Sequence, residues 1–191
     1  IDRLDYLKRD CFFAGVLEGT IGVDRIISML TVYNDQLVVE EKGILSIENF
    51  LNARRLMYWQ VYLHKTTVSA ERMMVNIIRR AEHLVKSGEG LPASESLLTF
   101  LRHTYSLDNF KDKAEVLNAY GLLDDNDIWG AIKLWRSHPD FILATLCKLL
   151  TERRLFQIRL GSESIRKEEI ERIREKVTQT FGILRSESSY F

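Results

Sequence analysis

The first ten residues of the chain bring together several side chains that could do chemistry. The segment from Ile1 to Asp10 holds three carboxylates, two arginines and a tyrosine. At about 100° per residue, a helix would sort it into a polar and an apolar face. The polar face consists of Asp2, Asp5, Tyr6, Arg9 and Asp10, and the apolar face of Leu4, Leu7 and Cys11. The polar face offers acceptors for a cation and donors for an anion, or it is a solvated face with Asp–Arg pairs.

A second group of such side chains recurs between residues 53 and 65. On one continuous helix, Arg54, Tyr58, Val61, Tyr62 and Lys65 would share a face, because they follow one another at helical spacing. The planar fork of an arginine donates two hydrogen bonds to a phosphate, and a tyrosine ring can stack on a planar group. In the alternative interpretation, the aromatic rings belong to the core and the cations reach along it to solvent.

Three segments of the chain, in order, resemble a known family. They are Asp2-Arg3-x-Asp5-Tyr6-Leu7-x-Arg9-Asp10 followed by Gly15, then residues 53–65, and then residues 122–129 with Arg153-Arg154-Leu155-Phe156. Together they resemble the HD-superfamily phosphohydrolases, specifically the deoxynucleoside triphosphate triphosphohydrolase (dGTPase-like) branch. The resemblance spans most of the chain.

The resemblance implies a divalent metal with Asp2 as its last ligand. In the family a His and a His-Asp pair complete that site, and the ion is a divalent metal such as Mn, Fe, Ni, Zn or Mg. The four histidines here, at positions 64, 83, 103 and 138, are isolated, and none precedes an Asp. We therefore expect a C-terminal fragment of a larger enzyme that holds no catalytic metal and is inactive by itself. His64 is more typical of a hydrogen-bonded structural histidine than of a catalyst.

The resemblance also implies a set of substrate-binding residues. Arg3 and Tyr6 match positions that approach the triphosphate, and Asp10 matches a position that accepts a hydrogen bond from the sugar hydroxyl. Further along, the residues expected to face the nucleotide are Arg54, Tyr62 and Lys65. Leu63 departs from the glutamine of some relatives, which leaves base recognition open. In the alternative, Arg3, Tyr6 and Asp10 only form salt bridges and hydrogen bonds along their helix.

The expected activity of the parent protein is hydrolysis of a dNTP to deoxynucleoside and triphosphate by a metal-bound water. One alternative is an HD-superfamily phosphohydrolase that acts on another nucleotide or phosphoester, because a fold does not determine a substrate. Another is a non-catalytic helical module for interaction or oligomerisation. The expected partners are a dNTP and further copies of the chain.

Composition narrows the class of protein. The 191 residues are 46% hydrophobic and 28% charged, which is ordinary for a globular domain. Lys and Arg number 27 and so do Asp and Glu, which makes a general nucleic-acid binder less favoured. Two cysteines far apart indicate reduced thiols in a cytoplasmic protein, and no apolar run approaches the ~20 residues of a membrane span.

The pattern along the chain predicts a mainly α fold with a small β-hairpin and a small terminal α+β unit. We expect a helical portion over residues 1–153 and a truncated α+β unit over 154–191. The expected helices cover 1–13, 47–86, 94–105, 110–119, 125–137, 139–152 and 164–181. The expected hairpin pairs 36–40 with 44–47, and the terminal unit has strands at 155–160 and from 183 toward 191.

Overall fold

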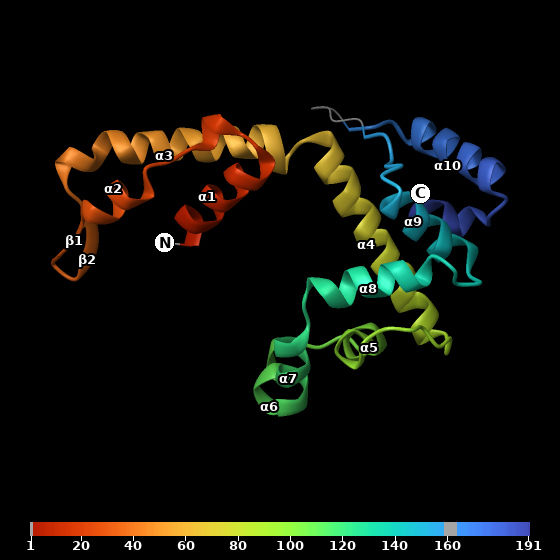
Figure 1. The fold of residues 1–191 in the computed structure, drawn as a ribbon. Coiled ribbons are helices and arrows are strands. Elements are labelled where there is room, and N and C mark those ends of the chain that lie inside the picture. Colours follow the sequence, from red (N-terminus) through yellow and green to blue (C-terminus); the bar gives the residue numbers. More distant parts are fainter. Residues whose placement is uncertain (1, 159–163) are drawn as a thin grey trace. The chain divides into compact units, whose positions relative to one another are not determined.

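The computed structural model describes residues 2–158 and 164–191, and it is mainly helical with one two-stranded hairpin (Figure 1). This confirms the predicted fold class in its main features. The chain divides into two compact units, Ile1–Val68 (unit 1) and Ser69–Phe191 (unit 2). Nowhere in the described ranges does a helix have both the length and the apolar character to cross a membrane.

Unit 1 holds three helices, a hairpin and three short helical turns. In chain order these are α1 (Asp2–Ala14), η1 (Leu17–Gly19), α2 (Val23–Ser28), β1 (Leu30–Tyr33), β2 (Gln36–Val39), η2 (Glu41–Gly43), α3 (Ile44–Met57) and η3 (Tyr58–Tyr62). Helix α1 matches its prediction to within a residue at each end.

The core of unit 1 forms between α1, η1 and α3. Leu7 of α1 and Met57 of α3 are completely buried, and the predicted apolar face of α1 is the face that packs inward. Gly19 lets η1 approach this core closely, because a Cβ there would lie 2.2 Å from the Cys11 sulfur. The same packing brings the polar residues of α1 beside the end of α3.

The hairpin lies earlier in the chain than the sequence pattern indicated. Strand β1 pairs antiparallel with β2, with Leu30 opposite Val39, and the turn between them is Asn34-Asp35. Both turn residues have positive φ, 50° and 58°, which matches the two-residue turn that suits the twist of a hairpin. The predicted second strand at 44–47 is the beginning of α3 instead, since residues 41–43 form a helical turn that leads into it.

The predicted helix from residue 47 to residue 86 is also interrupted. Helix α3 ends at Met57, the next five residues form the π-helical segment η3, and the backbone breaks at Leu63 and His64 before α4 (Lys65–Lys86). The Leu63 amide donates to the Tyr58 carbonyl at 2.9 Å, which is the i to i+5 bond of a π-turn. No proline or glycine marks the interruption. Periodicity alone therefore did not reveal it.

Unit 2 is built on the remaining part of α4 and the helices that follow it. These are α5 (Glu95–Arg102), α6 (Leu107–Asp112), α7 (Ala114–Leu122), α8 (Asp125–Trp135), α9 (Phe141–Thr151) and α10 (Lys167–Phe181), followed by the 3-10 segment η4 (Arg185–Tyr190). Met73, Ile77, Trp135 and Leu143 lie in its core and are fully buried. The Trp135 indole donates to the Pro92 carbonyl at 3.0 Å, so its polar atom is satisfied.

The predicted terminal strands are absent from the part of the chain that the structure describes. Residues 155–158 have no regular structure, residues 159 and 160 lie outside the described residues, and η4 occupies the place of the last strand. Phe156, Tyr190 and Phe191 pack against the same core as the rest of unit 2. The units divide after Val68, whereas the sequence placed a boundary after residue 153.

A largely buried ion pair holds η4 against α4 and α9. Arg80, which is 8% exposed, donates to both carboxylate oxygens of Asp140 at 2.6 and 3.1 Å, and Glu187 lies 3.2 Å away. Asp140 also accepts from the Leu143 amide at the start of α9. Burial opposes the charged form of Asp140, but the hydrogen bonds from Arg80 and Leu143 hold its pKa below the ordinary value.

Candidate functional site

The clearest polar contact between distant segments of unit 1 joins Tyr62 to Asp10. The Tyr62 hydroxyl donates to Asp10 Oδ2 at 2.6 Å, and both residues are half-buried. Burial, and then the hydrogen bond to the negatively charged Asp10, raise the pKa of Tyr62, so its hydroxyl stays protonated and remains a donor. Asp10 is thereby held in one orientation. A carboxylate has about four acceptor sites, so it can still accept from another group.

Two further aromatic rings and an arginine lie around this contact. The Tyr6 and Tyr62 rings meet edge to face with centroids 6.4 Å apart, and Tyr58 and Tyr62 do so at 5.1 Å. The Arg54 guanidinium carbon lies 5.5 Å from the centre of the Tyr58 ring. Interaction with Tyr58, and more weakly with Tyr6, raises the pKa of Arg54. We call Tyr6, Asp10, Arg54, Tyr58 and Tyr62 the tyrosine–arginine cluster.

One donor of this cluster has no partner. Arg54 Nε is buried and makes no hydrogen bond within the described structure. Buried donors of this kind are rare, and an unsatisfied one costs about 1–3 kcal/mol. The planar guanidinium can still donate from its other nitrogens to an anion. The arrangement is therefore suited to binding and orienting a molecule that has both a hydroxyl and a phosphate.

Four of the six residues that the sequence proposed for substrate binding are thus brought together, namely Tyr6, Asp10, Arg54 and Tyr62. Arg3 lies one turn before Tyr6 on α1, is exposed, and makes no hydrogen bond or ion pair with a described residue. Lys65 is the exposed first residue of α4, beyond the break at Leu63, so it does not continue the face that carries Arg54.

Tyr58 is the one residue of the cluster that was not among the predicted substrate-binding residues, because the sequence did not distinguish it from an aromatic residue of the core. Its ring touches both Tyr62 and the Arg54 side chain, although it is 39% exposed. Its position, four residues after Arg54 and four before Tyr62, was the sequence signal that it shares their helix face. The π-helical backbone that places these rings has no comparable signal in the sequence, although such segments are frequent at functional sites.

His64 takes a structural part next to the cluster. Its Nδ1 accepts a hydrogen bond from the Thr66 amide at 3.3 Å, and its carbonyl accepts from the Val68 amide at 3.0 Å. Both bonds satisfy donors of the first turn of α4, as a residue at a helix N-terminus does. This agrees with the structural role predicted for it.

The described residues do not by themselves form a metal site. Among them, no group of three or more His, Cys, Asp or Glu side chains converges as metal ligands. Asp2 is exposed at the start of α1 and belongs to no such group. Since a mixed site needs several converging ligands, Asp2 could serve only as one ligand among others supplied from elsewhere.

Comparison with known proteins points to one class. Residues 21–99 match the model of a family described as the HD associated region. The whole chain also superposes, with a TM-score of 0.93 and 48% identity, on 47% of a phosphohydrolase from Bacteroides thetaiotaomicron whose crystal structure is known. Both findings support an HD-type phosphohydrolase.

Particular relatives extend the likeness to other bacteria. The chain is 36% identical to the uncharacterized protein YwfO of Bacillus subtilis over 156 residues, which is 82% of this chain and 34% of YwfO. It is 25% identical over 201 residues to the uncharacterized protein MG461 of Mycoplasma genitalium, covering 99% of this chain and 46% of MG461. The chain thus spans less than half the length of these relatives.

Proposed function

We propose that this chain is the substrate-binding part of a metal-dependent phosphohydrolase that converts a dNTP to deoxynucleoside and triphosphate. The observation that carries the proposal is the tyrosine–arginine cluster, in which the Tyr62 and Tyr58 rings connect a fixed carboxylate to an arginine with an unpaired donor. The support for a phosphohydrolase comes from the family model and the structural neighbour. The deoxynucleotide substrate is our inference from the chemistry of the cluster and from the resemblance of its residues.

In this proposal the cluster recognises the two ends of a sugar phosphate. One carboxylate oxygen of Asp10 accepts a hydrogen bond from the sugar hydroxyl, while the other accepts from the Tyr62 hydroxyl. Arg54 donates to the phosphates, aided by Tyr6 and Arg3 from α1. Because Tyr62 and Asp10 are already hydrogen-bonded, little side-chain entropy is lost when the sugar binds.

The chemical step requires a divalent metal, for which Mn, Fe, Ni, Zn and Mg are the candidates. Asp2 would contribute one carboxylate to it, and the described residues contribute no further converging ligand. We therefore assign to this chain the binding and orientation of substrate and no step of bond cleavage. The 191-residue chain alone is expected to release no triphosphate from a dNTP.

The test uses a protein of the relatives' full length. Hydrolysis of a dNTP should yield deoxynucleoside and triphosphate, and release of orthophosphate or pyrophosphate would assign another phosphohydrolase activity instead. Activity on a different phosphoester in a substrate panel would have the same consequence. Full activity after Arg54→Ala and Tyr6→Ala would indicate a helical module without a substrate role.

The sugar contact has a sharper test. Asp10→Asn should lower kcat/KM for a dNTP about 10- to 150-fold, which corresponds to the ~1.5–3 kcal/mol of a hydrogen bond to a charged group. The same substitution should have little effect on a dideoxynucleoside triphosphate, which lacks the hydroxyl. Asp5→Asn, on the same helix and exposed, is the matched control. An equal loss for both substrates would remove Asp10 from sugar recognition.

A further inference from the structure

A hollow of about 490 Å³ lies in unit 2, where the end of α10 and the segment η4 meet the start of α9. Figure 1 shows the C-terminal segment beside these two helices. We call this hollow the α9–η4 cavity, and its lining includes Arg80, Asp140, Phe141, Phe181, Leu184 and Glu187. The cavity belongs to unit 2 and the tyrosine–arginine cluster to unit 1, so the two share no residue.

The charged lining of the α9–η4 cavity has a net charge of −1, because it holds one guanidinium and two carboxylates. Arg80 donates to both oxygens of Asp140 and lies 3.2 Å from Glu187. Glu187 also accepts from the Leu184 amide at 3.2 Å, which leaves about two of its roughly four acceptor sites free within the described structure. Since its side chain is 24% exposed, a ligand from solvent can reach it. The lining therefore offers an acceptor to a cation and repels an anion.

The two helix ends at the cavity favour the same sign of ligand. The N-terminus of α9, where an anion would otherwise bind, is already capped by Asp140, which accepts from the Leu143 amide at 2.7 Å. The C-terminus of α10 carries the partial negative charge of a 15-residue helix, and the last turn of this helix holds no basic side chain. Arg174 and Arg185, which flank that turn in the sequence, both pair with Glu171. A cation in the cavity would compensate the end of α10.

Apolar side chains complete the lining. The Phe141 and Phe181 rings have their centroids 6.5 Å apart, and Leu184 is 69% exposed. A methylene stem can pack on such side chains, and an ammonium group is attracted to the faces of aromatic rings. A bare metal ion would leave these apolar groups unused, and no three metal-ligating side chains converge in the described parts of the chain. The cavity therefore suits an organic cation better than a metal ion.

We propose that the α9–η4 cavity binds a primary alkylammonium group, supplied by a free polyamine or by a lysine side chain of another protein. The ammonium donates to Glu187 at the C-terminus of α10, and its methylene stem packs against Phe141, Phe181 and Leu184. Both sources share this chemistry and differ only at the other end of the stem. Because the contact is electrostatic and partly exposed, the affinity falls as the salt concentration rises.

The test is a chemical-shift titration of the isotope-labelled 191-residue chain with two amines. Cadaverine represents a free amine, and Nα-acetyl-lysine methylamide represents a protein lysine. At least one of them should shift the amide signals of Ile142, Gly182 and Leu184, and the tighter ligand identifies the source. Pentanediol, which has the same five-carbon stem as cadaverine but no charge, should not shift them.

Variants of the lining make the test specific. Glu187→Gln keeps the shape of the side chain and removes its charge, so the affinity for the amine should fall about tenfold. Leu184→Lys places a tethered ammonium at the cavity and should block the added amine. This change leaves the core intact, because Leu184 is 69% exposed. The unshifted signals of the core residues Ile77 and Leu143 report that each variant is folded.

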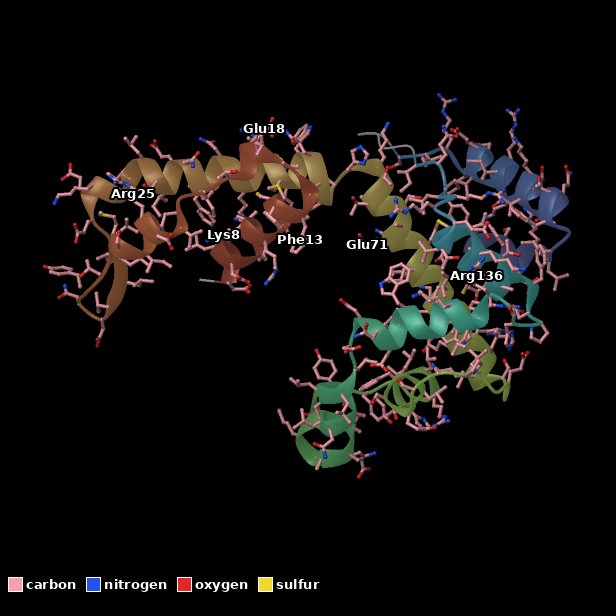
Figure 2. The ribbon with its side chains drawn as sticks, viewed as in Figure 1. Lys8, Phe13, Glu18, Arg25, Glu71 and Arg136 are labelled. Carbon is pink, nitrogen blue, oxygen red and sulfur yellow. The ribbon has the colours of Figure 1, made fainter. Side chains whose placement is uncertain are left out.

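The matched control is Glu71→Gln, which removes an exposed carboxylate of α4 that Figure 2 labels. It should leave the affinity for the amine unchanged. The proposal is overturned if neither amine shifts the cavity amides, or if pentanediol shifts them equally. It is also overturned if Glu187→Gln or Leu184→Lys leaves the affinity unchanged, or if Glu71→Gln lowers it as much as Glu187→Gln does.

Discussion

The hydrogen bond between Tyr62 and Asp10 should measurably couple α1 to η3, the π-helical segment that follows α3. Tyr62→Phe removes the hydroxyl donor and Asp10→Ala removes the carboxylate acceptor, so each change abolishes the hydrogen bond. The bond is 2.6 Å long and charge-assisted, and hydrogen bonds to charged groups contribute about 1.5–3 kcal/mol. Because both residues are half-buried, we expect a coupling energy in the lower half of that range, about 1.5–2 kcal/mol.

The assay is a double-mutant cycle read by amide hydrogen exchange in α1 and α3. Each single variant should lower the free energy of opening of these helices, and the double variant should lose much less than the sum of the two. Amides of α8 and α9 in unit 2 serve as the internal reference. A coupling energy below about 0.5 kcal/mol would mean that the hydrogen bond does not stabilise the contact between the two segments. It would also refute the claim that Tyr62 fixes the orientation of Asp10.

Other predictions concern the packing of each unit. Arg80→Leu should destabilise unit 2 by about 3–5 kcal/mol in urea denaturation, because it leaves Asp140 largely buried without its cation; a loss under 1 kcal/mol would contradict this. The pKa of Asp140 is lower in the folded protein than in the unfolded chain, where it is about 4. The ionised carboxylate therefore adds its full share to the free energy of unfolding above about pH 4, and this share is lost as the pH falls through the folded-state pKa. Asp140→Asn should make the free energy of unfolding depend less on pH in the acid range. Gly19→Ala should cost unit 1 about 1–3 kcal/mol because its Cβ would meet the Cys11 sulfur, whereas Gly121→Ala, with open space around it, should be neutral or slightly stabilising.

Much of the secondary structure followed from local signals. Ser94 caps α5 by accepting from the Leu97 amide, and Asp124 caps α8 in the same manner, as short polar side chains do at helix starts. Gly182 ends α10 in the left-handed conformation, with a φ of 63°. Such signals act over three or four residues. They are therefore readable without knowledge of the fold.

The sequence predicted most residues of the candidate site one by one, but it did not predict that Tyr62 contacts Asp10. Helical spacing placed Arg54 and Tyr62 on one face, and the resemblance named Tyr6 and Asp10 on another helix. The approach of Tyr62 to Asp10 across 52 positions of sequence depends on how α1 and α3 pack. Tyr58 joined the cluster for the same reason, through the π-helical segment that follows α3.

The sequence by itself determined the helical class, the caps, and the apolar face of α1 with Leu7 at its centre, because each depends on the order of neighbouring residues. Only the tertiary structure decided where the helix after residue 47 breaks, which segments pair in the hairpin, and that residues 185–190 form a 3-10 turn rather than a strand. A strand requires a partner at a given distance, and a break in a helix requires contacts that outweigh a regular backbone. Both depend on residues far away in the chain, such as Arg80 with Glu187, whose meeting no local pattern specifies.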